Sequence, residues 1–203
     1  IGLTFLSGVL GTGHHYYYIG VNKIWLVVGG IFSALEPLAF LAMALFAVNM
    51  YRKGEKSHPN KIALFWTIGS AIVSFVGAGL LGFAHTLPQT NLYTHGTLVT
   101  AMHGHYAFWG AYAMIVLAII SYALPNLTGR KRYESTQGMA AFWLSNVGML
   151  GMTVAFGVAG VAQVYMERKM KMDFMDVQNE ISIHFVVLLI CATMFTTGIG
   201  LFI

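Results

Sequence analysis

Apolar runs of about 20 residues, the length that crosses a bilayer as an α-helix, dominate this sequence. Of its 203 residues, 57% are hydrophobic and only 9% are charged. These long runs lack the alternation of barrel strands, and a helix pairs its backbone polar groups internally within a bilayer. The sequence therefore predicts an all-α, polytopic transmembrane helix bundle in one membrane domain. The expected helices are residues 1–15, 24–50, 60–86, 94–124, 138–165 and 180–203.

The run at residues 1–15 is too short to span a bilayer unless it continues upstream. The chain starts at Ile1 inside this run and stops in the apolar sequence GIGLFI. We therefore expect a truncated fragment of a longer membrane protein, containing about six helices.

The eleven Lys and Arg residues are divided among short polar breaks and form no single basic face. This pattern argues against nucleic-acid binding and predicts topology instead, since basic residues gather on the cytoplasmic side. Seven lie in the breaks around 52–61 and 130–132, which we expect to be cytoplasmic. The end of run 1–15 and the start of run 94–124 then lie in the outer half of the membrane. The single cysteine, Cys191, leaves no disulfide framework and no CxxC metal site.

The stretch GTGHHYYYIG places His14 and His15 side by side at the end of the first run. Buried imidazoles without partners are costly in a membrane, and imidazole is a common ligand of iron, copper and zinc. Adjacent side chains diverge by about 100° on a regular helix. Joint ligation of one metal therefore requires the helix to end or distort there, which Gly11, Gly13 and Gly20 permit.

A second cluster, His103-Gly104-His105, lies in run 94–124, with His95 before it. Residues two apart on a helix lie about 200° apart around its axis, so the two rings face opposite sides. They suit two hemes that flank one helix, with Gly104 leaving room for a flat ligand. On a continuous helix, His95 lies about 80° from either ring and ~12 Å nearer the outer surface, facing the heme rims.

Glu36, in the sequence FSALEPLAF, is the one acid inside an apolar run. An intramembrane carboxyl is a functional candidate by default. Pro37 leaves a carbonyl of the preceding turn unbonded, which makes the local backbone polar. We favour a proton-handling role, and the alternative is a protonated Glu36 that only satisfies a neighbouring helix.

Other patterns have structural interpretations. We interpret His58, His85 and His184 as packing residues. The small residues of two runs either let helices approach closely or leave room for a porphyrin, and both interpretations stay open. These small residues are Gly77, Ala78, Gly79, Gly82, Gly151, Ala155 and Ala159.

The paired histidines and the later HGTxxTxxHGH block resemble the heme–copper oxidase superfamily. GTGHHYYYIG, FSALEP and HGTLVTAMHGHYAFWGAY are similar to the large subunit of the bacterial nitric oxide reductases of the cytochrome-c-dependent type. The resemblance covers essentially the whole chain and implies the C-terminal half of that subunit, helices seven to twelve of a twelve-helix fold. No lysine occurs between Lys23 and Arg52, which favours this group over oxidases with a lysine-bearing proton path.

The resemblance implies a respiratory electron-transport oxidoreductase of denitrification that reduces two NO to nitrous oxide and water. It implies a high-spin and a low-spin b-type heme and a non-heme iron, and it allows a calcium ion. The implied partners are membrane lipid, a c-type cytochrome subunit as electron donor, and the N-terminal half of the same subunit. The implied location is the bacterial inner membrane, as a multi-pass protein with its active site toward the periplasmic half.

The resemblance also assigns metal ligands. His14 and His15 are implied to bind the non-heme iron. His103 is implied as the proximal ligand of the high-spin heme, and His105 as one axial ligand of the low-spin heme.

Two further roles, and several ligands outside this chain, follow from the same resemblance. His95 is implied to lie near the heme propionates. Glu36 is implied to lie near the non-heme iron and to assist proton delivery. A third histidine, a further glutamate and the second axial ligand are implied upstream of Ile1, so this chain alone forms an incomplete site.

Three alternative functions remain open from the residues. An oxygen-reducing heme–copper oxidase would hold copper instead of iron, since imidazole binds both metals. A diheme cytochrome would only relay electrons, with His14 and His15 merely packing. A transporter with Glu36 on its proton path leaves the other histidines unexplained. Quinol-dependent reductases are close relatives of the favoured group, so the electron donor also stays open.

Overall fold

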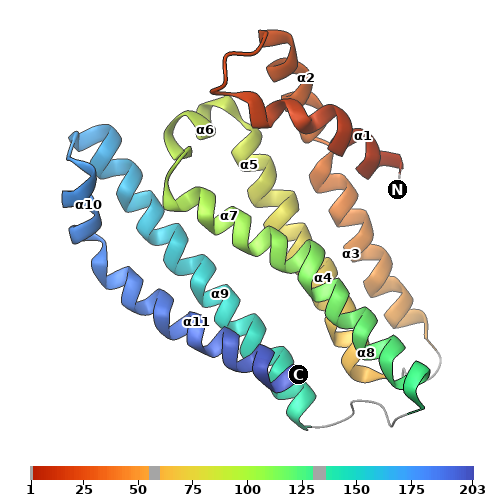
Figure 1. The fold of residues 1–203 in the computed structure, drawn as a ribbon. Helices are drawn as coiled ribbons and strands as arrows, with labels where there is room; N and C mark the ends of the chain where they lie inside the picture. The colour runs from red at the N-terminus through yellow and green to blue at the C-terminus, as the bar shows by residue number, and fades with distance from the viewer. Residues whose placement is uncertain (1, 55–59, 130–135) are drawn as a thin grey trace.

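The computed structural model describes residues 2–54, 60–129 and 136–203, and every regular element within these ranges is helical. Long helices run side by side between two ends of the bundle, and α1 crosses them at one end (Figure 1). The α-helices are α1 (Gly2–Gly11), α2 (Lys23–Ser33), α3 (Glu36–Lys53), α4 (Lys61–Ser74), α5 (Gly82–Thr86), α6 (Pro88–Thr94), α7 (Leu98–Phe108), α8 (Met114–Thr128), α9 (Thr136–Val164), α10 (Phe174–Glu180) and α11 (Ser182–Phe202). Other helical geometries join them, namely the 3-10 helix η1 (Thr12–Tyr16) and the π-helices η2 (Phe75–Leu81), η3 (Trp109–Ala113) and η4 (Tyr165–Met170).

Five stretches of the described chain are long and apolar enough to cross a membrane. They are Lys23–Lys53, Lys61–Thr86, Leu98–Thr128, Thr136–Lys169 and Ser182–Phe202. This finding confirms the all-α membrane bundle, and the chain is a multi-pass membrane protein. The first expected helix, 1–15, differs because its described part is α1, of ten residues, followed by η1.

The expected helix at 24–50 is divided into α2 and α3 by a turn at Ala34 and Leu35. Pro37 lacks an N–H and cannot continue a helix that enters from upstream, but it is well placed in the first turn of a new one. Glu36 therefore begins α3 at the break between two half-helices.

The expected helix at 94–124 starts and ends later in the structure. Gly96 has a left-handed φ of 73°, which ends α6 before α7 begins. Thr97 then caps α7 by accepting a hydrogen bond from the Val99 N–H with its side chain. His95 consequently lies in the turn before α7, and the expectation that it shares a helix with His103 is wrong.

At its other end this span passes through Pro125 and continues to Thr128. Pro125 has no N–H to bond the carbonyl of Ser121, four residues earlier. The side-chain amide of Asn60, at the start of α4, donates to that carbonyl at 2.8 Å. The helix therefore tolerates its proline, and it ends at Gly129, whose φ of 64° suits a C-terminal glycine.

An aromatic core holds α4, α7–α8 and α9 together. Trp66 is fully buried, and its ring packs edge-on against Phe142 at 5.0 Å and Trp109 at 6.0 Å between centroids. Edge-on aromatic pairs add to the free energy gained by burying their apolar area. This core fixes the relative positions of the spans that carry the histidines.

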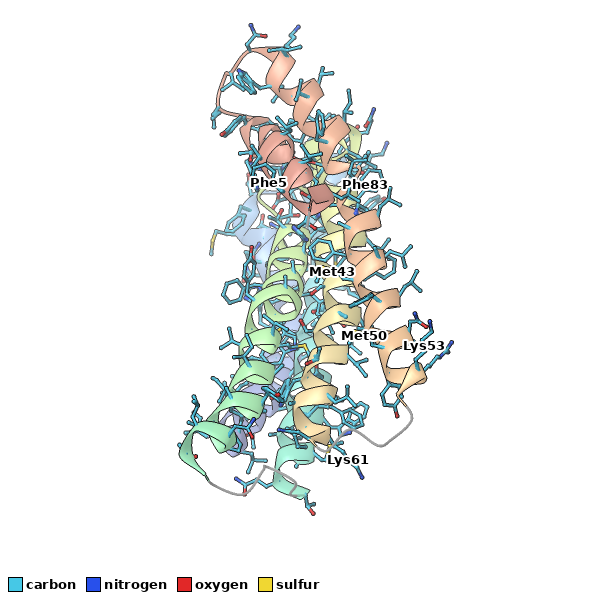
Figure 2. The ribbon with its side chains drawn as sticks, turned by 90° about the vertical axis from the view of Figure 1, so that its right-hand side faces the viewer. Phe5, Met43, Met50, Lys53, Lys61 and Phe83 are labelled. Carbon is cyan, nitrogen blue, oxygen red and sulfur yellow. The ribbon has the colours of Figure 1, made fainter. Side chains whose placement is uncertain are left out.

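The two ends of the bundle differ in the connections that they carry. The breaks after α3 and after α8 lie at one end, whereas η1, α6 and α10 lie at the other (Figure 1). Lys53 and Lys61 lie at the first of these ends (Figure 2). The prediction that the two histidine clusters share one end is therefore confirmed. Lys56, His58 and the basic residues 130–132 lie outside the described residues.

The outer side of α1 and α3 is apolar. Phe5, Met43 and Met50 project from it (Figure 2), and each is at least half exposed. A surface of this composition is suited to lipid or to further transmembrane helices.

Candidate metal centre

The α-helical geometry of α1 ends at Gly11, and the next turn, η1, carries His14 and His15. The two ring centroids are 4.1 Å apart and the ring planes are tilted by 42°. This distortion is the one that joint ligation requires, and it brings both rings to one side. A Cβ on Gly29 of α2 would lie 2.5 Å from the backbone nitrogen of His14. Glycine on α2 therefore lets η1 lie directly on that helix.

Ser33 orients the His14 ring. Nδ1 of His14 lies 2.6 Å from the Ser33 Oγ, and Ser33 Oγ lies 3.3 Å from the Gly11 carbonyl oxygen. The carbonyl can only accept, so the consistent arrangement has Ser33 donating to Gly11 and accepting from Nδ1–H of His14. That tautomer leaves the lone pair of Nε2 on His14 available to a metal.

Tyr17 ties η1 to the corner between α5 and α6. Its hydroxyl donates a hydrogen bond to the backbone carbonyl of Thr86, which is buried. Burial raises the pKa of the Tyr17 phenol, so the hydroxyl keeps its proton as the donor. The segment carrying His14 and His15 is thereby anchored to the span that ends at Thr86.

His103 projects from α7 toward η2 and α5. Its Nδ1 donates to the Gly77 carbonyl at 2.9 Å, and its ring stacks on His85 with centroids 5.2 Å apart and planes 23° apart. Gly77 lies in a π-helix, where the regular helical hydrogen bonds are interrupted. As with His14, the bonded Nδ1 leaves Nε2 available to a metal.

Glu36 and His103 border the same space above Gly82. A Cβ on Gly82 would lie 3.2 Å from Cε1 of His103 and 3.9 Å from Oε2 of Glu36. His103 also lies within electrostatic range of His14 and His15. The structure therefore gathers these histidines and the carboxyl in one region. Gly82 makes room there for the His103 ring.

His105 faces the opposite side of α7, as its spacing from His103 predicts. Its Nδ1 bonds the Ala101 carbonyl of its own helix at 2.8 Å, and its ring lies 4.9 Å from Phe156 of α9. The side chain is exposed, and a Cβ on Gly104 would meet nothing within 4 Å. This open surface beside two imidazoles suits a wide, flat ligand.

His95 lies at the same end of the bundle without belonging to α7. Its ring lies 4.3 Å from that of Tyr18, and its carbonyl accepts from the Arg168 guanidinium at 3.4 Å. The structure therefore places His95 beside the segment after η1 and beside η4.

The donor set fits hemes and a metal that draw further ligands from elsewhere. Within the described residues, no three His, Cys, Asp or Glu side chains are arranged to hold one ion. His14, His103 and His105 each have a bonded Nδ1, which leaves Nε2 as the coordinating atom. One or two ligands per metal is what the sequence predicts for a chain whose other ligands lie upstream.

Several site residues were not predicted from the sequence. The hydrogen bonds of Ser33 and Gly77 depend on helices that meet only in the fold. His85 was interpreted as a packing residue, yet it stacks on His103. Nothing in the local sequence around these residues signals their contacts.

The family model described as "Cytochrome C and Quinol oxidase polypeptide I" matches residues 1–194. The chain belongs to this family. The match confirms the predicted membership of the heme–copper oxidases, and members of this family are helical membrane proteins, as the bundle requires.

A named relative of this oxidase-family chain is a subunit, designated B, of the nitric oxide reductase of Stutzerimonas stutzeri. The two are 44% identical over 207 residues, which cover 98% of this chain and 44% of the relative. The chain thus spans less than half the length of that relative. The similarity confirms the resemblance to the nitric oxide reductases that the sequence motifs indicate.

Proposed function

We propose that this chain is the C-terminal part of the catalytic subunit of a membrane nitric oxide reductase. The reaction joins two NO molecules, two electrons and two protons into nitrous oxide and water. The observation that carries the proposal is the arrangement around His103. Its Nε2 is left free by the Gly77 carbonyl, it shares the space above Gly82 with Glu36, and it lies within electrostatic range of His14 and His15.

The histidines divide among three metal groups in this proposal. His103 binds a high-spin b-type heme and His105 binds a low-spin one, because their rings leave opposite sides of α7. His14 and His15 bind a non-heme iron together with ligands from the rest of the subunit. When bound, the hemes and the iron supply the electrons and the adjacent metal positions at which two NO molecules are joined.

The protein groups orient the ligands and deliver the protons. Ser33 holds the His14 ring in the tautomer that exposes Nε2, and the Gly77 carbonyl does the same for His103. Hydrogen bonds of this kind fix ring orientation and make the ligand a stronger donor. Glu36 holds a proton on its carboxyl beside the same space and transfers it to the reacting NO oxygen.

His95 belongs to the propionate side of the hemes in this proposal. The Arg168 guanidinium lies against its backbone carbonyl, and cations of this type pair with carboxylates. The region therefore offers both an imidazole and a positive charge to the propionate groups.

The partners and the orientation are part of the same proposal. The exposed apolar sides of the bundle meet membrane lipid and the N-terminal half of the same subunit, and a c-type cytochrome subunit delivers the electrons. Lys53 and Lys61 lie at the end opposite to the histidines (Figure 2), and basic residues favour the cytoplasmic side. The protein then lies in the bacterial inner membrane with its site toward the periplasm.

Metal analysis of the full-length subunit, purified with its partner, tests the proposal. Iron and copper are measured by mass spectrometry, heme b by pyridine hemochrome, and NO consumption with a reduced c-type cytochrome. We expect one iron beyond two hemes, no copper and consumption of NO. Copper equimolar with the protein would instead indicate an oxygen-reducing oxidase. Two heme irons without a third metal would indicate an electron relay.

A further inference from the structure

His85 is a buried histidine that the proposed function does not use. It lies in α5, its side chain is 9% exposed, and its Nδ1 bonds the Leu81 carbonyl at 3.2 Å. Its Nε2 is buried without a hydrogen-bond partner among the described residues. A buried polar atom without a partner is unfavourable, so an apolar side chain would fit this site better if packing alone mattered.

The flat contact between the two rings gives His85 a role toward His103. The planes are 23° apart with centroids 5.2 Å apart, so the His85 ring lies along the face of the His103 imidazole. The Gly77 carbonyl fixes His103 at Nδ1 but leaves the ring free to swing about that hydrogen bond. A neighbouring ring face restricts that swing, and metal ligands need their orientation held by such supporting groups.

The backbone of this corner is itself fixed on two sides. The Asn91 side chain donates to the His85 carbonyl at 2.8 Å, and the Tyr17 hydroxyl donates to the Thr86 carbonyl. Tyr17 follows His15 by two residues. The His85–Thr86 corner therefore contacts His103 through one residue and the His14–His15 segment through the next.

We propose that His85 is a positioning residue whose ring fixes the plane of the His103 imidazole. The adjoining Thr86 carbonyl, held by Tyr17, ties that ring to the segment that carries His14 and His15. The corner thus sets how the two metal sites are placed relative to each other. This inference rests on the proposed function in taking His103 as a heme ligand.

The test compares His85→Phe with His85→Ala in the full-length subunit with its partner. Phenylalanine keeps a flat ring and removes both nitrogens, whereas alanine removes the ring. The readout is the iron–histidine stretching band of the ferrous high-spin heme in resonance Raman spectra. We expect His85→Ala to shift or broaden the band, or to lose this heme, and His85→Phe to keep the wild-type band.

His184→Ala is the matched control. His184 lies in α11 and bonds the Ile181 carbonyl at 3.1 Å, a local contact of the kind that His85 makes with Leu81. This variant should leave the band unchanged. A wild-type band in His85→Ala, or an equal shift in His85→Phe and His85→Ala, would overturn the role of the ring plane.

Tyr17→Phe tests the tie to the other metal site. Losing the bond to Thr86 should broaden the same band, by less than His85→Ala does, with heme content unchanged. An unaltered band would overturn this part of the inference. His103→Ala separates the proposed function from the inference, because a band that survives this substitution shows that His103 is not the ligand, whatever His85 does.

Discussion

The two faces of α7 support their histidines in different ways. On one face, His103 is half-buried, bonded to a carbonyl of another span and stacked on His85. On the other face, His105 is exposed and bonded to a carbonyl of its own helix. The orientation of His103 is thus set by tertiary contacts, and that of His105 mainly by its own helix.

The difference matches what each ligand has to do in the proposed function. His103 is the single protein ligand of its heme and faces a second metal, so its direction must be fixed before any metal binds. His105 shares its heme with a second axial ligand outside this chain. A ligand pair can orient a heme jointly, and looser local support is then sufficient.

Removing each ligand in turn should give the largest effect and the sharpest contrast. His103→Ala should lose the high-spin heme and all NO reduction, whereas His105→Ala should lose the low-spin heme and keep the high-spin one. Optical and electron paramagnetic resonance spectra of the full-length complex measure both hemes. If each substitution removed both hemes equally, the two faces would not be independent.

Glu36→Gln should separate proton delivery from ligation on the His103 face. Glutamine keeps the size of the side chain and removes its acid, so NO reduction should fall by about 10²–10⁴-fold, the usual contribution of a general acid. Both heme spectra should stay unchanged, since Glu36 approaches His103 without holding it. Turnover and spectra measured on one preparation check this, and an altered low-spin heme would contradict it.

Ser33→Ala should weaken the non-heme metal site alone. The substitution removes the hydroxyl that orients His14, and loss of such a supporting group lowers metal affinity about 10–100-fold. Iron content after dialysis against a chelator measures the effect, with both heme contents as internal controls. Wild-type iron retention would show that the bond from His14 to Ser33 has no part in metal binding.

Two glycines offer a smaller test of the same contrast. A Cβ on Gly77 would lie 2.7 Å from the backbone of Tyr106, whereas one on Gly104 would meet nothing within 4 Å. Gly77→Ala should therefore destabilise the bundle by about 1–3 kcal/mol through overpacking. Gly104→Ala should not lower the stability of the heme-free protein. Thermal unfolding in detergent compares them, and equal midpoints would contradict the close contact at Gly77.

The sequence predicts the spans and the broad layout of the site. Apolar length and basic breaks locate the membrane helices, and a separation of two residues places His103 and His105 on opposite faces. Both rest on local periodicity, which the fold preserves. The adjacency of His14 and His15 likewise predicts the distorted turn in which they lie.

The remaining features depend on contacts between distant segments. The helical position expected for His95 fails because Gly96 takes a left-handed conformation and starts α7 afresh at Leu98. The span through Pro125 continues because Asn60, far away in sequence, bonds the carbonyl that the proline leaves free. The role of His85 is hidden for the same reason, since its partner lies on another span.

The π-helical turns have a consequence for how this protein tolerates change. Each one adds about one residue to a helical repeat, which displaces the two flanking segments by about 100° in helical phase. In the span from Leu98 to Thr128, η3 separates the part bearing the imidazoles from the part packed in the apolar bundle. The two parts of one continuous span therefore obey separate phases. Deleting a single residue of η3 would turn the ligands away from their sites while every apolar residue below kept its own face.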